Sequence, residues 1–429
     1  MGGRHVGVFE GDWRRASFRY DTDAPERPIS LSLPRDGGWS ENAPLVFLNN
    51  LLPESGEQRY LMMRRMGAKS QQPFDLLDRI DNIGDLVFSS TDEYPTVETM
   101  PAAQAEKDGS DIAARIVEIK ANPAKWWTDD PHARFSLGGM QGKFTLSRVG
   151  GKWFWPNAAT PSTHILKPEG VGTPGAVANE SGMLRLAAAC GVETTDSGIA
   201  VFDGHHSFMT ARFDRETVDG KPVRIHAEDV CSALGVPAGS KYDVRAADVL
   251  SLLHRIDPDD GLAYAWIGQL AFSTYSGNAD AHARNYTLLA ATGDGYRLSP
   301  LYDAVCTACW PALSTRLAMP VGGEDRASRV GDAEWAALAR SNRLDEGRVV
   351  DMARNMASGI ARNAWIALRG QPSAAADRMG RMLESIPAVA RRQVRTEPPA
   401  PPHAGMVWVE GHWRNGHWVD GYWRSRPTR

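Results

Sequence analysis

A short polar segment between two apolar stretches constrains this chain more than any other feature. Residues 278–285 read Asn-Ala-Asp-Ala-His-Ala-Arg-Asn. The stretch before them, LAYAWIGQLAFSTYSG, predicts a buried helix, and the stretches after them, NYTLLA and YRLSPLY, predict a strand pair around the Gly-Asp-Gly turn at 293–295. Acidic and amide groups packed between apolar elements are costly to bury unless they are paired or used. The segment is therefore either a structural turn capped by Asn and Asp side chains or a functional site.

The spacing within this segment favours a functional site. Asp280 and Asn285 form the pattern Asp-x-x-x-x-Asn, the spacing of the protein-kinase catalytic loop, in which the Asp accepts the substrate hydroxyl proton and the Asn holds Mg²⁺. Asp303 follows eighteen residues after Asn285 at the end of the return strand. This is the position of the aspartate that bridges Mg²⁺ to the nucleotide phosphates. Hard oxygen ligands of this kind suit Mg²⁺.

Three upstream features fit the same chemistry, although each has a plainer interpretation. Residues 136–143, Ser-Leu-Gly-Gly-Met-Gln-Gly-Lys, either let the backbone approach phosphates closely or form a simple hairpin turn. They are not a Walker A loop, which would need Gly at Leu137 and Ser or Thr at Phe144. Lys167, on a predicted inner strand, either extends to the sheet edge or places a fixed charge in a cleft. Glu180, predicted at the start of the next helix, either orients Lys167 or favours the helix N-terminus by its charge.

The order of these features along the chain predicts a fold of the α+β class. The order is a glycine-rich loop, a strand with Lys167, a helix with Glu180, the Asp-x-x-x-x-Asn loop and then Asp303. Bilobal protein-kinase-like folds have this order. We expect an N-terminal α+β lobe and a largely helical C-terminal lobe. The predicted regions are an N-terminal subdomain (1–100), a connector (101–132), a kinase N-lobe with the glycine-rich loop (133–218), a helical C-lobe (219–393), a Pro-rich linker (394–405) and a Trp-rich tail (406–429).

The tail has a composition of its own. WVEGHW at 408–413 and WVDGYW at 418–423 repeat at a ten-residue spacing around Asn415-Gly416, which is a strong hairpin signal. The repeat resembles the Trp/Tyr-Gly repeats of various Gram-negative bacterial proteins. Because an isolated two-stranded hairpin is marginal in water, we expect the tail to dock on the body, on a partner or on another copy of itself.

Composition excludes several classes of protein. A net charge of -4 and a charged content of 23% give no global sign of a surface that binds polyanions. Four cysteines are too few for a disulfide framework, and Cys306 and Cys309 form a C-x-x-C without a second pair beside it. The N-terminus lacks a signal-peptide core, and no apolar run is long enough to span a bilayer. The sequence therefore predicts a cytoplasmic protein without a membrane partner.

Residues 5–390 resemble the HipA family, the serine/threonine-kinase toxins of type II toxin–antitoxin systems. The resemblance is carried, in order, by LSLP, LNNLLPES, SQQPFDLL, SLGGMQGK, THILKP, NES, ARFDR, EDVCSALG, KYD, DAHARN and LYDAV. It implies a HipA N-terminal lobe joined to a bilobal kinase domain that uses ATP and Mg²⁺, with Asp280 as the catalytic base and Asn285 and Asp303 as metal ligands. The nucleotide contacts that it implies are Gly138, Gly139, Met140, Gln141, Gly142, Lys143, Lys167, Ala211, Arg212, Phe213, His282, Ala283, Arg284, Asn285, Tyr302 and Asp303.

The resemblance also implies a substrate, a regulatory site and partners. HipA kinases phosphorylate an aminoacyl-tRNA synthetase, typically the glutamyl enzyme, and so arrest translation and growth. They are inactivated by autophosphorylation of a glycine-loop serine, which here is Ser136. A phosphate there adds about −1.5 to −2 charge where the ATP phosphates must lie. The implied partner is a HipB-like helix-turn-helix antitoxin, which brings the kinase to operator DNA.

Three departures from the family pattern leave questions open. Ala211 stands where the family commonly has Glu, which puts nucleotide preference in doubt and leaves adenine recognition to backbone groups. Gly142 replaces a common acidic residue and is expected to loosen the glycine loop, and the tail lies outside the pattern. A small-molecule kinase and a non-catalytic, nucleotide-sensing co-repressor are the alternative functions. Retention of Asp280, Asn285 and Asp303 together argues against the co-repressor.

Overall fold

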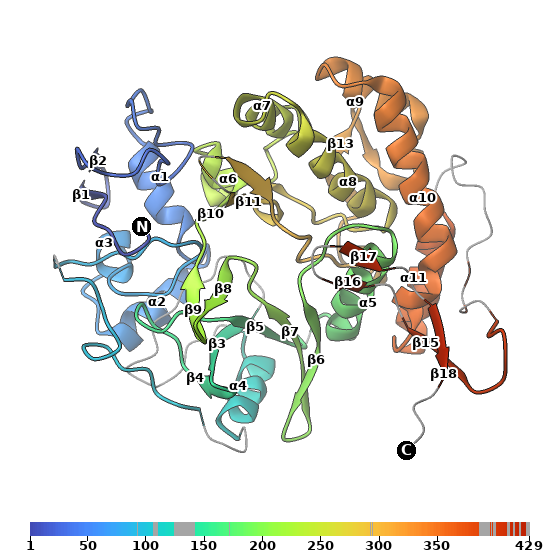
Figure 1. The fold of residues 1–429 in the computed structure, drawn as a ribbon, viewed down its shortest axis with the longest axis horizontal. Coiled ribbons are helices and arrows are strands. Elements are labelled where there is room, and N and C mark those ends of the chain that lie inside the picture. Colours follow the sequence, from blue (N-terminus) through green and yellow to red (C-terminus); the bar gives the residue numbers. More distant parts are fainter. Residues whose placement is uncertain are drawn as a thin grey trace. The chain divides into compact units, whose positions relative to one another are not determined.

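The protein folds into two compact units, each assembled from separate parts of the chain (Figure 1). The computed structural model describes residues 1–91, 93–105, 110–123, 142–170, 172–291, 293, 295–385, 395, 397, 400–409, 412–414, 417–419 and 422–425. Unit 1 comprises Met1–Pro174, Gly198–Val244 and Tyr286–Ser299, and unit 2 comprises Gly175–Ser197, Arg245–Asn285 and Pro300–Arg429. The six regions predicted from the sequence, from the N-terminal subdomain to the Trp-rich tail, rest on composition and resemblance. Their boundaries stay predictions.

A five-stranded sheet with the order β4-β3-β5-β7-β6 is the centre of unit 1. Its strands are β3 (Phe144–Val149), β4 (Lys152–Phe154), β5 (His164–Pro168), β6 (Ser197–Phe202) and β7 (His205–Ala211). The hairpin expected at Gly150-Gly151 is confirmed, because β3 and β4 pair in antiparallel fashion across these two glycines. Both glycines have positive φ, 55° and 79°, and this left-handed backbone is readily adopted only by glycine.

The alternation of side chains along β5 decides what each face of the sheet carries. Leu166 is fully buried in the same core cluster as Ile112 and Ile116 of α4 (Ser110–Ala121), a helix that contacts β5 and β7. Because successive residues of a strand point to opposite faces, the neighbour Lys167 points to the face away from this core. The sheet thus separates an apolar layer from a face that carries a buried lysine.

The N-terminal part of unit 1 surrounds a second portion of the same core. Its elements are β1 (Gly7–Gly11), β2 (Ala16–Tyr20), α1 (Ala43–Asn50), α2 (Gly56–Met66) and α3 (Pro73–Leu76). Helix α2 begins where the Ser55 side chain accepts a hydrogen bond from the Gln58 N–H, and it ends at Gly67, which has φ +66°. Leu33, Leu52 and other buried apolar residues of this part belong to the cluster that includes Leu166.

The chain that follows the polar segment returns to unit 1 as part of a three-stranded sheet. Its order is β10-β11-β12, and the strand pair predicted around 293–295 is confirmed as β11 and β12. Arg27 donates hydrogen bonds to the carbonyls of Ala291, Gly293 and Gly295 and so holds the turn between them. The remaining elements of the unit are β8 (Arg215–Val218), β9 (Lys221–Arg224), β10 (Ala227–Asp229), α6 (Val230–Ala233), η1 (Ala238–Ser240), β11 (Thr287–Ala290) and β12 (Tyr296–Leu298).

Unit 2 is built mainly of helices packed on the long helix α10. The elements are α5 (Ala176–Ala189), α7 (Ala246–Ile256), α8 (Gly261–Tyr275), η2 (Ala283–Asn285), η3 (Thr307–Cys309), β13 (Arg316–Val321), β14 (Glu324–Arg326), η4 (Ala327–Arg329), α9 (Asp332–Ser341), α10 (Glu346–Leu368) and α11 (Ser373–Glu384). Helix α10 contacts α5, α8, α9 and α11. Gly182 of α5 meets α10 so closely that a Cβ atom would lie 2.7 Å from the Ala367 carbonyl oxygen. A larger residue at Gly182 would force these two helices apart.

The Trp-rich tail forms two nested antiparallel pairs and lies against the helices of unit 2. Strands β16 (His412–Arg414) and β17 (His417–Val419) pair around the predicted two-residue turn, whose residues lie outside the described part of the chain. Strands β15 (Met406–Val409) and β18 (Tyr422–Ser425) pair outside them. The ring of Trp408 stacks edge-on against Trp365 of α10 at 5.8 Å between centroids, and β16 contacts α5. The structure thus shows docking on the body of the protein.

None of the described helices combines the length and the apolar character that crossing a bilayer requires.

Candidate functional site

The predicted catalytic loop follows helix α8 and is folded tightly by its own hydrogen bonds. The Asp280 N–H donates to the Asn278 Oδ1 at 3.1 Å, and the His282 N–H donates to the Asp280 carbonyl at 2.8 Å. The Asn285 N–H donates to the His282 carbonyl at 2.9 Å and closes the turn η2. The Asp280 side chain is half-buried, whereas His282 and Asn285 are buried. The backbone of this loop is therefore fixed within unit 2.

The amide group of Asn285 has a defined orientation. Its Nδ2 donates to the carbonyl oxygen of Asp280 at 2.9 Å. A primary amide carries its donors on nitrogen and its acceptor on oxygen, so this bond turns the Oδ1 atom away from the loop backbone. The Oδ1 is the atom that a metal ligand must present. This orientation is compatible with the metal-ligand role expected for Asn285, which stays a prediction.

The segment that carries Asp303 is tied to the catalytic loop on both sides. Before Asp303, the Tyr302 hydroxyl donates to the carbonyl of Arg284 at 2.8 Å. After Asp303, Thr307 donates its N–H at 3.0 Å and its hydroxyl at 3.1 Å to the carbonyl of Gly277. The Thr307 hydroxyl also accepts the Ala279 N–H at 3.1 Å. The structure therefore brings the segment with Asp303 together with the loop that holds the predicted base.

Asp303 itself has an unusual backbone. Its φ is +53°, in the left-handed region that residues with a side chain rarely adopt. Strain of this kind persists where surrounding structure over-determines it, and it concentrates at functional sites. The bonds from Tyr302 and Thr307 supply that surrounding constraint.

Helix α5 carries the acidic residue of the predicted constellation. Glu180 is buried and is the fifth residue of the helix, so it does not lie in the first turn, where a charge would mainly serve the helix N-terminus. Its neighbour Asn179 holds the segment after Asp303: the Asn179 Nδ2 donates to the Cys306 carbonyl at 3.2 Å, and the Cys306 N–H donates to the Asn179 Oδ1 at 2.9 Å. The pairing of Glu180 with Lys167 stays a prediction.

The donor atoms of this region fit Mg²⁺ better than a metal with an all-protein cage. Asn285 and Asp303 offer one amide oxygen and one carboxylate, and Mg²⁺ binds through one or two such ligands together with phosphate oxygens and waters. In the part of the chain that the structure describes, no three His, Cys, Asp or Glu side chains are grouped to hold a metal ion. A cation at Asn285 and Asp303 would therefore depend on oxygens supplied by a nucleotide.

The predicted nucleotide residues of unit 1 are described only in part. Ser136, Gly138, Gly139, Met140 and Gln141 lie outside the described residues. The described residue at the end of the loop, Gly142, is buried, and a Cβ atom there would lie 2.7 Å from Ile119 Cγ2. An acidic residue would not fit at this position without a shift of α4, so packing accounts for the glycine.

Lys167 lies on β5, which is an inner strand of the sheet, as predicted. Lys167 is buried, with 6% of its surface exposed, and its Nζ lies 5.7 Å from the centroid of the Phe208 ring on β7. A buried ammonium group near an aromatic ring keeps its charge only where other groups compensate the lost hydration. Lys143, which precedes β3, is half-buried.

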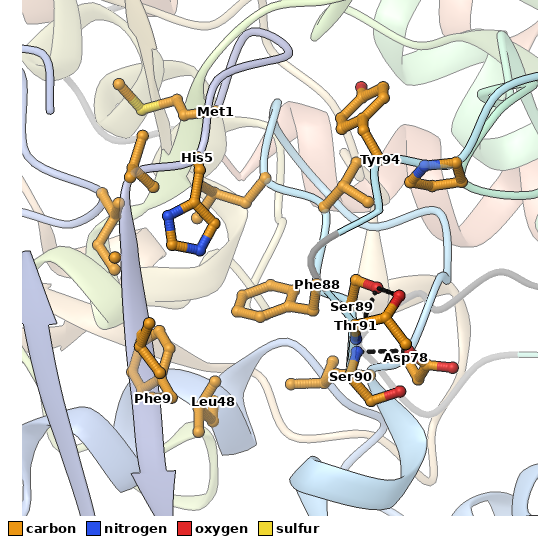
Figure 2. A pocket seen from close by; sticks show the side chains of 18 of the residues that line it. Met1, His5, Phe9, Leu48, Asp78, Phe88, Ser89, Ser90, Thr91 and Tyr94 are labelled. Atoms are coloured by element: carbon orange, nitrogen blue, oxygen red, sulfur yellow. Dashed lines mark hydrogen bonds between the residues drawn. The ribbon is translucent and has the colours of Figure 1, made fainter. Parts of the chain in front are cut away.

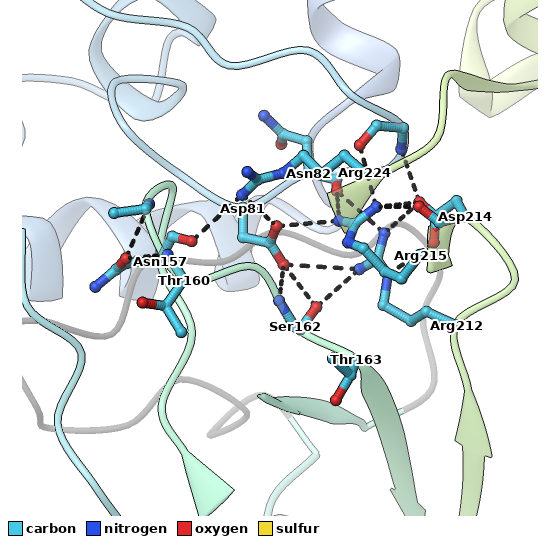
Figure 3. Close-up of polar contacts among 12 residues, drawn as sticks. Asp81, Asn82, Asn157, Thr160, Ser162, Thr163, Arg212, Asp214, Arg215 and Arg224 are labelled. Carbon is cyan, nitrogen blue, oxygen red and sulfur yellow. Dashed lines mark hydrogen bonds and ion pairs between the residues drawn. The ribbon is translucent and has the colours of Figure 1, made fainter. Parts of the chain in front are cut away.

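The predicted hinge lies at the end of β7, where a buried ionic network fixes it (Figure 3). Ala211 and Phe213 are half-buried, and Arg212 between them is buried. The Arg212 guanidinium binds both carboxylate oxygens of Asp214, at 2.9 and 2.7 Å, and donates to the Ser162 hydroxyl at 3.1 Å. Its side chain is thus used within the protein, and a nucleotide would meet backbone groups of this segment.

The network extends from the hinge to residues far away in the sequence. Asp81 accepts from Arg215 at 3.0 Å, from Arg224 at 2.9 Å and from the Ser162 hydroxyl at 2.6 Å. Burial raises the pKa of Asp81, but the neighbouring arginines outweigh this and hold the pKa below its ordinary value. Asp214 behaves in the same way, because Arg212 and Arg215 hold its pKa far below the ordinary value against the effect of burial. We refer to Asp81, Arg212, Asp214, Arg215 and Arg224 as the hinge network.

Unit 1 also contains a cavity of about 500 Å³, and its described lining includes none of the predicted site residues (Figure 2). Apolar side chains that include Phe9, Leu48 and Phe88 form much of its wall, and Ser89 and Thr91 add hydroxyl groups. The cavity lies between β1 and the segment around residues 86–95. No pattern in the sequence pointed to it, because its lining comes from several short, separate segments.

Sequence patterns missed most of the residues that hold the catalytic loop in place; Asn278 is the exception, because a turn capped by Asn and Asp side chains was one of the two interpretations of this segment. These anchors are Asn179, Asn278 and Thr307, and each of them binds backbone atoms of the loop or of the segment after Asp303. The NES motif at 179–181 was part of the family resemblance, but nothing in the sequence assigned Asn179 this contact. The partner of Thr307 lies 30 positions away, so no local pattern assigned this contact.

Two protein families match this chain in successive parts. Residues 1–89 match the HipA N-terminal domain, and residues 135–365 match the HipA-like C-terminal domain. The second match covers more than half of the 429 residues and includes Asp280, Asn285 and Asp303.

Individual relatives extend over most of the chain. Y4mE of Sinorhizobium fredii, which is named as a candidate kinase, is 31% identical over 379 residues, 84% of this chain and 90% of that protein. The serine/threonine-protein kinase toxin HipA of Shewanella oneidensis is 27% identical over 336 residues, 73% of this chain and 72% of that protein.

A solved structure shares the fold. One chain of the Shewanella oneidensis toxin–antitoxin complex of HipA, HipB and operator DNA superposes with a TM-score of 0.74 at 23% identity, covering 90% of this chain and 95% of that chain. This likeness confirms the predicted α+β, protein-kinase-like HipA fold. The two domain matches and the 31% identical relative show that this chain belongs to the HipA family.

Proposed function

We propose that this protein is an ATP- and Mg²⁺-dependent serine/threonine protein kinase that acts as the toxin of a toxin–antitoxin pair. The observation that carries the proposal is the anchoring of the Asp303 segment to the loop of Asp280 and Asn285 through Tyr302 and Thr307. Family membership adds support, because relatives over most of the chain are named as kinases.

In the proposed reaction, Asp280 is the general base. Its carboxylate accepts the proton of a serine or threonine hydroxyl while the hydroxyl oxygen attacks the γ-phosphorus of ATP, and the bond to the β-phosphate oxygen breaks to release ADP. Base assistance of this kind contributes on the order of 10²–10⁴-fold in rate. The half-buried position of Asp280 is compatible with access by a protein substrate.

The other predicted residues position the nucleotide. Asn285 and Asp303 would hold Mg²⁺, which when bound neutralises charge on the phosphate oxygens. Lys167 would add a fixed positive charge, with Glu180 as its orienting partner. The proposed contacts to ATP are the set given by the family resemblance, from Gly138 to Lys143, Ala211 to Phe213, His282 to Asn285, and Tyr302.

The finer parts of the proposal concern substrate, regulation and partners. We infer an aminoacyl-tRNA synthetase of the glutamyl type as the substrate and a cytoplasmic location. Autophosphorylation of Ser136 would inactivate the enzyme by placing negative charge beside the ATP phosphates. A HipB-like antitoxin would bind the kinase and bring it to operator DNA, as the components of the Shewanella oneidensis complex suggest.

Transfer of ³²P from labelled ATP tests the proposal. The wild type should label itself and purified glutamyl-tRNA synthetase, whereas Asp280→Asn should abolish both signals. Asp259→Asn is the matched control, because Asp259 is an exposed carboxylate of the same unit. Equal labelling by wild type and Asp280→Asn would overturn the assignment. Absent labelling together with nucleotide-dependent operator binding by the antitoxin complex would favour the co-repressor.

A further inference from the structure

Two cysteines lie on either side of the residue that anchors the catalytic loop. Cys306 and Cys309 form the C-x-x-C of the sequence, and both are free and buried. Thr307, whose hydroxyl and N–H hold Gly277, lies between them. The reaction proposed above uses neither thiol.

The local backbone suits a bond between the two sulfur atoms. The Cys309 N–H donates to the Cys306 carbonyl at 3.2 Å, which is the i to i+3 bond of the 3₁₀ turn η3. In such a turn, side chains three residues apart are eclipsed, and the rise of about 2 Å per residue separates their Cα atoms by roughly 6 Å. Disulfides join Cα atoms about 4.4–6.8 Å apart. The spacing of this turn is therefore compatible with a disulfide between Cys306 and Cys309.

The two thiols already interact, and their roles differ. The hydrogen bond from Cys306 lowers the pKa of Cys309, and the same bond raises the pKa of Cys306. Arg378 of α11 also lowers the pKa of Cys309, whereas burial acts in the opposite direction. Because the thiolate is the reactive form, the direction of these shifts favours Cys309 over Cys306 as the attacking group.

The same turn is linked to α5 and covered by α11. Asn179 binds both the N–H and the carbonyl of Cys306. The Cys309 thiol donates to the Ala375 carbonyl of α11 at 3.8 Å. A covalent bond between the cysteines would therefore act on the segment that joins Asp303, the catalytic loop and α5.

We propose that Cys306 and Cys309 form a redox-modifiable dithiol, which a hydroperoxide converts to a disulfide, and that the disulfide slows phosphoryl transfer by displacing Thr307. The first half stands on the geometry of the turn alone. The second half rests on the proposed kinase activity.

The chemistry balances with hydrogen peroxide as the oxidant. The Cys309 thiolate attacks one peroxide oxygen, the O–O bond breaks, and a sulfenic acid and hydroxide form. The Cys306 sulfur then attacks the Cys309 sulfur, the S–O bond breaks, and the released hydroxide and the thiol proton leave as water. In total, two thiols and one peroxide give one disulfide and two waters. A dithiol reductant reverses the reaction by exchange.

Mass spectrometry of the full-length protein tests the first half. After a peroxide pulse, alkylation and trypsin digestion, the peptide 298–316 contains both cysteines and no methionine. We expect this peptide to lose two hydrogens and to regain them with dithiothreitol.

In Cys306→Ser, dimedone should trap a sulfenic acid on Cys309, whereas in Cys309→Ser it should leave Cys306 unlabelled. Alkylation of both cysteines after peroxide would overturn the proposal. If a serine variant fails to fold, the alanine variant at the same position replaces it.

Enzyme rates test the second half. Oxidised wild type should phosphorylate itself more slowly than the reduced protein by on the order of tenfold, the effect expected when catalytic groups are misplaced. Cys190→Ser should respond like wild type, and a variant with both Cys306 and Cys309 replaced by Ser should not respond to peroxide. A disulfide without loss of rate would overturn the regulatory half. An inactive reduced protein would instead defeat the proposed kinase function, while the mass data would still decide the dithiol.

Discussion

The hinge network of unit 1 and the catalytic loop of unit 2 are both held by many hydrogen bonds, but with different kinds of groups. The hinge network consists of five charged side chains, with Asp81 fully buried and Arg224 9% exposed at the side chain. The loop is anchored by Asn179, Asn278, Thr307 and Tyr302, all neutral. Charged side chains fix the hinge network, whereas these four anchors of the loop carry no charge.

The difference follows from what each region has to do. Buried charges give rigid, directional contacts, but they are costly unless every partner is present. A catalytic loop must keep its carboxylates for a proton and a cation, and none of its neutral anchors adds a countercharge that would compete for them. We therefore expect changes in the hinge network to reduce stability first and changes in the loop anchors to reduce rate first.

The largest effect is expected from Asp81→Asn. This change removes the charge that faces Arg215 and Arg224, and breaking a buried ion pair on one side costs about 3–5 kcal/mol. Chemical denaturation should show the loss, and hydrogen exchange should locate it in β5 and β7 of unit 1. Because the folded pKa of Asp81 is depressed below 3.8, its contribution is present above that pH and is lost as the pH falls further.

Asp325→Asn is the matched control for this experiment. Asp325 pairs with Arg316 at the surface of unit 2, and exposed ion pairs contribute little to stability. If Asp81→Asn were as stable as the control, buried charge would not be what fixes the hinge.

The hinge network also shows what a sequence cannot reveal. Asp280, Asn285 and Asp303 could be predicted as one site because their spacing and flanking patterns lie within one short stretch. Asp81 meets Arg215 from 134 positions away, and no local periodicity encodes such a contact.

The hairpin at Gly150-Gly151 and the tail hairpin were predicted for the same local reason. The fold class followed from the order of the motifs, whereas the contacts of Asn179 and Thr307 did not, since their partners lie 127 and 30 positions away. The pairing of Lys167 with Glu180 and the roles of the glycine loop remain predictions.

The next largest effect is expected from Glu228→Gln. Glu228 is a carboxylate that is buried like Asp81, but it accepts hydrogen bonds from neutral donors, so it tests whether charged partners make the difference. Glu228 of β10 accepts hydrogen bonds from the Ser30 hydroxyl and the Leu31 N–H. Burial raises its pKa from 4.5 to about 7, despite the opposing hydrogen bonds and His226. Because the folded-state pKa is raised, the stabilisation is complete below pH 4.5 and is lost as the pH rises through about 7.

Glu228→Gln should remove this pH dependence. A shift of this size corresponds to on the order of 3 kcal/mol, and Gln can offer an acceptor to Leu31 and a donor to Ser30. Thermal unfolding at pH 5 and pH 8 should show a gap between wild type and variant that grows with pH, in favour of the variant. A constant gap would show that the pKa of Glu228 is not raised in the folded protein.

The smallest effect is expected from Thr307→Val, and it separates the two regions most sharply. Valine keeps the shape of threonine but removes the hydroxyl that accepts the Ala279 N–H and donates to Gly277. The loop should lose its preferred position, so we expect kcat for ATP-dependent autophosphorylation to fall on the order of tenfold with little change in KM. Thr307→Ser, which keeps the hydroxyl, should retain most of the rate. If Thr307→Val instead unfolded the protein or left kcat unchanged, neutral anchoring would not be a device for positioning catalytic groups, and the contrast with the hinge network would fail.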